Sequence, residues 1–166
     1  MKKLSVLFAA VMMFFAVGVA KAQKIASLDV ASVLNAMPEK KKTDEQLQAL
    51  SASKQTEIKK QADAAQALFV KYQGESAKQT PEVNKQREAE LQKLQENLQS
   101  LSQTAQKDLA DKTDAAYAPI EKKFNDALAK AAKANGWDFV FDSNNPALIY
   151  KGGADATAAV KKELGL

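Results

Sequence analysis

The sequence contains no cysteine and no histidine, and only 6 glycines, 4 prolines and one tryptophan among its 166 residues. Without cysteine there are no disulfide bonds and no thiolate chemistry. Without either residue there is no zinc finger and no Ser-His-Asp or Cys-His nucleophile. Three aspartates could in principle pair as catalytic carboxylates: Asp29, Asp138 and Asp142. They alternate with apolar residues, however, and the sequence indicates no pocket around them. We therefore predict a protein that is not an enzyme, with no cofactor and no metal.

The segment 142–146 has some features of a calcium-binding loop, because Asp142, Ser143 and Asn144 follow one another. The glycine and the distal glutamate of such a loop are missing, and Pro146 occupies a ligand position. We interpret the segment as a turn.

Residues 1–22 form a distinct segment that contains three lysines and no acidic residue. Two lysines precede the apolar run Leu4–Ala20, and Ala20-Lys21-Ala22 supplies the small residues of a cleavage site. This pattern predicts a cleavable secretory signal. An uncleaved anchor is the alternative, but the run is slightly short of the ~20 residues of a spanning helix, and without cysteine a lipoprotein anchor is excluded. Cleavage leaves an exported chain, Gln23–Leu166, whose formal charge is +1 rather than +4.

Residues 43–116 are rich in Ala, Gln, Lys and Glu, with 13 glutamines between Gln46 and Gln106. Their apolar residues recur at alternating steps of three and four, which is typical of a narrow coiled-coil seam. Between two such runs, Gly74 can end a helix, Thr80 can cap the next one, and Pro81 suits its first turn. We predict an antiparallel helical hairpin with its tip near residues 74–80. The first run places these residues on the seam: Leu47, Leu50, Lys54, Ile58, Ala62, Ala65, Phe69 and Tyr72.

The two flanking segments, 23–42 and 117–166, carry more large apolar residues than the middle. They should meet in one discontinuous β-rich body, with a kink or a break and restart of the helix at Pro119. Its expected elements are a strand at 25–30, a short helix to Met37, a helix ending at Asn135-Gly136, strands at 137–142 and 147–150, and a last helix capped by Asp155. Such a small core supplies only marginal stability by itself, so we expect oligomerisation to complete it.

Both ends of the mature chain resemble one known family. The first strand Lys24–Val30, the helix-to-strand segment Ala118–Asp142 and the tail with Ala147–Tyr150 and Asp155–Leu164 are similar to the Skp/OmpH family of periplasmic chaperones. The resemblance implies a mainly α fold with a small β body (α+β), in which the hairpin projects from a body completed by trimerisation. It further implies an ATP-independent periplasmic holdase that keeps unfolded outer-membrane proteins from aggregating in a cavity between the arms of a homotrimer.

The residues chosen for these roles are of two kinds. Off-seam apolar or small positions of the hairpin are the candidates for client contact: Val70, Ala77 and Val83. Apolar residues of the predicted strands are the candidates for the trimer body: Ile25, Leu28, Val30, Phe139, Phe141 and Ile149. Near the tip, Phe69 and Tyr72 could contact a client or a membrane, but we interpret them as closing the end of the seam.

Other partners are less well supported by the sequence. The hairpin carries 13 basic and 12 acidic residues between Lys40 and Ala116, without a continuous basic stripe, so we expect no nucleic-acid binding. The near-neutral mature charge also weighs against strong contact with lipopolysaccharide or a membrane surface. A structural coiled-coil scaffold or spacer of the envelope, without affinity for unfolded chains, is the alternative function.

Overall fold

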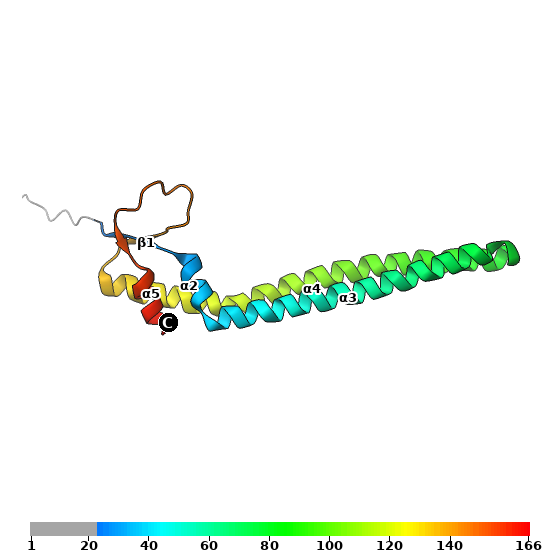
Figure 1. Cartoon of the computed structure of the whole chain (residues 1–166), viewed down its shortest axis with the longest axis horizontal. Helices are drawn as coiled ribbons and strands as arrows, with labels where there is room; N and C mark the ends of the chain where they lie inside the picture. The colour runs from blue at the N-terminus through cyan, green and yellow to red at the C-terminus, as the bar shows by residue number, and fades with distance from the viewer. Residues whose placement is uncertain (1–22) are drawn as a thin grey trace, which may run out of the picture.

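The computed structural model describes residues 23–166; the predicted signal segment lies outside the described residues. The described chain is mainly helical, with a small sheet at one end of a long helical hairpin (Figure 1). The mainly α fold with a small β body is therefore confirmed. The division into arm and body at residues 42/43 and 116/117 stays a prediction.

The hairpin consists of helix α3 (Pro38–Glu75) and helix α4 (Pro81–Asn135), joined by a short 3-10 helix, η1 (Ser76–Lys78). Thr80 caps α4, since its hydroxyl accepts a hydrogen bond from the backbone N–H of Val83, and Pro81 occupies the first turn. The turn predicted near residues 74–80 is thus confirmed. At 1.5 Å per residue, the 38 residues of α3 span about 57 Å.

Helix α4 continues through Pro119, so a break and restart of the helix at this residue is wrong, whereas a kink there stays a prediction. A proline inside a helix loses one backbone hydrogen bond and costs about 3 kcal/mol. Just beyond it, α4 buries one apolar face against the sheet and α5, and this packing holds the helix together across the proline. The buried residues of that face are Ile120, Phe124, Ala127 and Ala131. The helix ends at Gly136, whose φ of 68° is left-handed, as the Asn135-Gly136 pair predicted.

The sheet is parallel and has the order β2-β1-β3. Its strands are β1 (Ile25–Leu28), β2 (Phe139–Asp142) and β3 (Ala154–Asp155). The strand predicted at 147–150 is wrong: this segment has no regular structure, and β3 takes the place of third strand. Strand β1 is paired with β2 along one edge and with β3 along the other. Residues 147–150 therefore find no free edge of β1 to pair with, although their composition favours a strand.

Strand β1 also ends earlier than expected. Asp29 caps helix α2 (Val30–Ala36), because its carboxylate accepts a hydrogen bond from the N–H of Ser32 over 2.9 Å. Val30 therefore begins a helix and does not belong to the strand. Helix α5 spans Thr157–Leu164. As predicted, Asp155 caps its start, because the Asp155 carboxylate accepts a hydrogen bond from the N–H of Thr157 over 2.8 Å. The residue at the formal cap position is Ala156.

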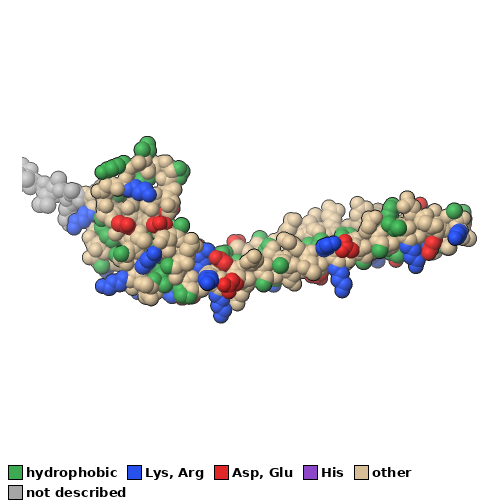
Figure 2. All heavy atoms as spheres, viewed as in Figure 1, with side chains coloured by type: hydrophobic (Ala, Val, Ile, Leu, Met, Phe, Trp, Pro, Cys, Tyr) green, Lys and Arg blue, Asp and Glu red, His purple; other side chains and the backbone are tan. Residues whose placement is uncertain are grey.

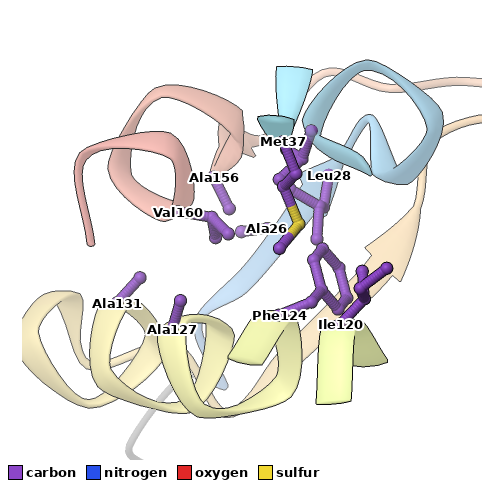
Figure 3. Packing of buried hydrophobic residues seen from close by; sticks show 10 residues of the cluster. Ala26, Leu28, Met37, Ile120, Phe124, Ala127, Ala131, Ala156 and Val160 are labelled. Carbon is purple, nitrogen blue, oxygen red and sulfur yellow. The ribbon is translucent and has the colours of Figure 1, made fainter. Parts of the chain in front are cut away.

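The core of the body lies between one face of the sheet and the helices α2, α4 and α5. Figure 3 shows Ala26 and Leu28 of β1 pointing towards Phe124 and Ala127 of α4, with side chains of α5 and Met37 beside them. The core cluster consists of Ala26, Leu28, Val33, Met37, Ile120, Phe124, Ala127, Ala131, Ala156 and Val160. Both terminal segments of the mature chain contribute to it, as the distribution of apolar residues predicted.

Candidate binding surfaces

The small sheet has one buried face and one open face. Residues paired across parallel strands share a face, and Ile25 pairs with Phe139 while Ser27 pairs with Phe141. Ile25 is 51 % exposed, and Phe139 and Phe141 are each 47 % exposed. The rings of the two phenylalanines stack at 6.4 Å between centroids. The chain thus leaves one Ile and two Phe side chains together on an uncovered face.

The segment 143–153 between β2 and β3 extends this apolar surface. It forms a hollow of about 340 Å³ with the open face, lined on the strand side by Ile25 and Phe141 and on the loop side by Leu148 and Tyr150. Ile149 is 97 % exposed. In Figure 2, hydrophobic side chains gather along the loop side of the body. The sequence predicted a strand here, and therefore missed Leu148 and Tyr150 as surface residues.

The six residues predicted for the trimer body do not share one environment. Ile25, Phe139, Phe141 and Ile149 are exposed, whereas Leu28 is fully buried in its own chain. Val30 packs against the same core from the first turn of α2. Leu28 therefore offers no free surface to a second molecule, whereas Val30 keeps part of its side chain exposed.

The helical hairpin has almost no interior of its own. Among the described residues, Ala105 is the single buried side chain between residues 43 and 116. The two helices are lined instead by half-buried side chains, with open hollows along the seam. One hollow of about 480 Å³ is lined by Ala65 and Phe69 of α3 and by Leu91 and Leu98 of α4. Both helices thus leave apolar side chains partly open along the seam.

The three predicted client-contact residues lie around the tip. Val70 is 57 % exposed and Ala77 is also exposed, whereas Val83 is half-buried in the first turn of α4. Phe69, interpreted as part of the seam, lines the seam hollow that faces α4, but its side chain is nearly half exposed and Leu68 beside it is the more buried residue. A helix of 3.6 residues per turn shifts its inward face gradually, so a strict alternation of three and four steps left Leu68 out of the predicted seam.

A polar cluster closes the seam near the tip. The Arg87 guanidinium contacts Glu75 at 2.6 Å and lies 4.4 Å from the centre of the Tyr72 ring. The Tyr72 hydroxyl donates a 2.6 Å hydrogen bond to Glu90, which raises the pKa of Tyr72. Tyr72 thus links the two helices, as interpreted from the sequence.

Further ion pairs join α3 and α4 along the hairpin. Lys54 and Asp108 lie 3.2 Å apart, and the hydrogen bond from Lys54 holds the pKa of Asp108 below its usual value. At the base, Asp44 accepts hydrogen bonds from Lys40 and from the hydroxyl of Tyr117, and its pKa is lowered for that reason. Figure 2 shows basic and acidic side chains interleaved along the visible side of the hairpin. Several of its charges therefore pair with one another.

The described residues were also searched for ion sites and membrane spans. Residues 23–166 contain no cluster of three or more Asp or Glu side chains placed to hold a metal ion. None of the helices in this part of the chain is both long and apolar enough to span a bilayer. The candidate sites are thus surfaces: the open sheet face with its loop, and the exposed apolar side chains of the hairpin.

Comparison with known proteins identifies a family and a fold. The profile of the family described as "Outer membrane protein (OmpH-like)" matches residues 24–164. A crystal structure from Caulobacter crescentus, provisionally described as an OmpH-like outer membrane chaperone, superposes with a TM-score of 0.72 at 16% sequence identity, covering 86% of this chain and 84% of that one. A comparison with curated proteins found no match.

Proposed function

The chain belongs to the OmpH-like outer membrane protein family, and on this premise we propose that it is an ATP-independent periplasmic holdase chaperone. Its clients are unfolded outer-membrane proteins. The observation that carries the proposal is the helical hairpin, which has almost no interior of its own yet exposes Phe69 and Val70 near its tip. A rod that served only as a spacer would have no need for apolar side chains at these positions.

Unfolded barrel proteins have a chemistry that suits such a surface. Their strands alternate apolar and polar residues and aggregate by pairing edge to edge. Many weak apolar contacts, spread over several arms, retain such a chain while each contact exchanges rapidly. The glutamine-rich walls keep the arm soluble, because a continuous apolar wall would itself aggregate.

Assembly into a homotrimer is part of the proposal. The open face with Ile25, Phe139 and Phe141 would be covered by other copies of the chain, and the three hairpins would then surround a common cavity. Full burial of a Phe or Ile side chain contributes about 1.5–3 kcal/mol. Three such side chains in each copy are therefore a substantial driving force for association.

The proposed location is the periplasm, reached by an export signal that is cleaved after Ala22. The mature chain then has a formal charge of +1, so contact with lipopolysaccharide or membranes would be weak. Apolar contact is accordingly expected to dominate client binding, and raising the salt concentration should weaken it little.

The decisive experiment dilutes a urea-unfolded outer-membrane barrel protein into buffer and follows light scattering with and without the mature protein. Suppression of scattering at one trimer per client is expected, without added nucleotide. Undiminished scattering at that ratio would contradict the holdase and favour the alternative, a coiled-coil scaffold of the envelope. Sedimentation of the protein alone measures the oligomeric state separately.

A further inference from the structure

We infer that Gln23 of the exported chain is converted to pyroglutamate, so that the mature protein begins with a lactam ring instead of a free amine. The inference rests on the proposed export and on cleavage after Ala22, which makes Gln23 the first residue. Glutamine is the residue whose side-chain amide can react with its own α-amino group when it stands at the N-terminus.

The structure leaves Gln23 free to react and holds the residue that follows it. Within residues 23–166, Gln23 is exposed, precedes β1 and takes part in no hydrogen bond found there. Lys24 is held on both sides: its N–H donates to the Asp138 carboxylate over 2.9 Å, and its carbonyl oxygen accepts hydrogen bonds from the N–H groups of Asp138 and Phe139. These hydrogen bonds begin at Lys24, and ring closure at Gln23 disturbs none of them.

The reaction needs no oxidant, cofactor or second substrate. The unprotonated α-amino nitrogen attacks the side-chain amide carbon and forms a C–N bond. The bond from that carbon to the amide nitrogen breaks, and this nitrogen leaves as ammonia after taking the proton that the attacking amine gives up. With an ordinary α-amino pKa of about 7.7–8.0, on the order of one molecule in ten carries the reactive form at neutral pH.

The modification would protect the sheet. It removes the terminal charge, as other N-terminal blocking groups do, and leaves no free amine for an aminopeptidase. Stepwise trimming of Gln23 and Lys24 would remove the hydrogen bonds that join the start of β1 to Asp138 and Phe139. Because β1 is the central strand, paired with both β2 and β3, its first residues are the ones whose loss would loosen the whole sheet.

The test uses the full chain, expressed with its own signal in a Gram-negative host and purified from the periplasm. Its intact mass and its N-terminal fragment are followed by mass spectrometry during incubation at neutral pH. We expect the mass of residues 23–166 less one ammonia, with the loss localised to Gln23, and release of that residue by pyroglutamyl aminopeptidase. Gln23 that remains uncyclised throughout the incubation would overturn the inference.

A matched variant excludes the other source of ammonia loss. The Asn135-Gly136 pair can form a succinimide, which also releases ammonia, and Gln23→Ala keeps this pair. The variant should show no loss and should be trimmed by a general aminopeptidase that leaves the cyclised protein intact. Equal trimming of the two proteins would contradict the protective role. An N-terminus at another residue would overturn both the cleavage site and this inference, whereas the holdase is decided separately by light scattering.

Discussion

Lys54 of α3 and Asp108 of α4 lie 3.2 Å apart across the seam of the hairpin. Each is about one-third exposed, and Asp108 also contacts Lys112 within its own helix at 3.4 Å. A two-helix rod with almost no buried side chains depends on such contacts to align its helices. The ion pair therefore sets the register between α3 and α4 more than it adds to stability, because ion pairs that solvent can reach contribute little.

Acid should loosen the hairpin. The pKa values of Asp44 and Asp108 are lowered in the folded chain by hydrogen bonds from lysines. A carboxyl with a depressed folded pKa stabilises the fold above its unfolded pKa of about 3.9, and this contribution is lost as the pH falls through the folded value. We expect the melting temperature, followed by circular dichroism, to fall below about pH 4.

A pair of variants tests the origin of this pH dependence. Asp108→Asn removes the inter-helix pair and should lower the melting temperature only slightly at neutral pH, while flattening its decline in acid. Asp63→Asn is the control, because Asp63 pairs only with Lys59 of the same helix, at 2.7 Å. Identical pH profiles for the two variants would show that the contact between helices is not the cause.

Phe141→Asp should dissociate the proposed trimer. It places a charge on the open sheet face and removes about 1.5–3 kcal/mol of apolar burial in each copy. Size-exclusion chromatography with mass detection should show monomers. Val70→Asp, which adds the same charge on the hairpin, should remain trimeric. A Phe141→Asp protein of unchanged mass would contradict the assignment of this face to assembly.

Val70→Asp should instead weaken client binding. If each of three arms loses roughly 0.5 kcal/mol of contact, retention of the client falls about tenfold. The scattering assay should then need more protein for the same suppression. Gln55→Asp adds an equal charge to an exposed and already polar position of α3, and should behave like the parent. Equal loss in both variants would indicate a general charge effect.

Replacing either of two glycines by alanine should change the stability of the protein, but in opposite directions. Gly136 has a φ of 68°, where a side chain costs about 1–2 kcal/mol, so Gly136→Ala should destabilise the protein. Gly74 lies in the last turn of α3, with open space where the new methyl group would point. Gly74→Ala should therefore stabilise the protein by up to ~1 kcal/mol. Urea unfolding measures both changes.

Part of the candidate surfaces could be predicted from the sequence. Ile25, Phe139 and Phe141, chosen as apolar residues of the predicted strands, and Val70, chosen as an off-seam position of the hairpin, are all exposed, and their roles in assembly and client contact stay predictions. The exposure of Phe69, the burial of Leu28 and the surface formed by Leu148 and Tyr150 could not be predicted. These depend on which strands pair and on how far each helix rotates, and neither is visible in local spacing.

The sequence by itself determined the elements that local interactions control. The cap at Thr80, the end of α4 at Gly136 and the helical hairpin depend on hydrogen bonds and apolar periodicity within a few residues. Only the tertiary structure decided that β3 lies at Ala154–Asp155, that α4 continues through Pro119, and that Lys54 meets Asp108. Each of these features depends on residues far away in the chain. Strand β1 pairs with residues more than a hundred positions later. The burial of α4 against the body outweighs the free-energy cost of its proline.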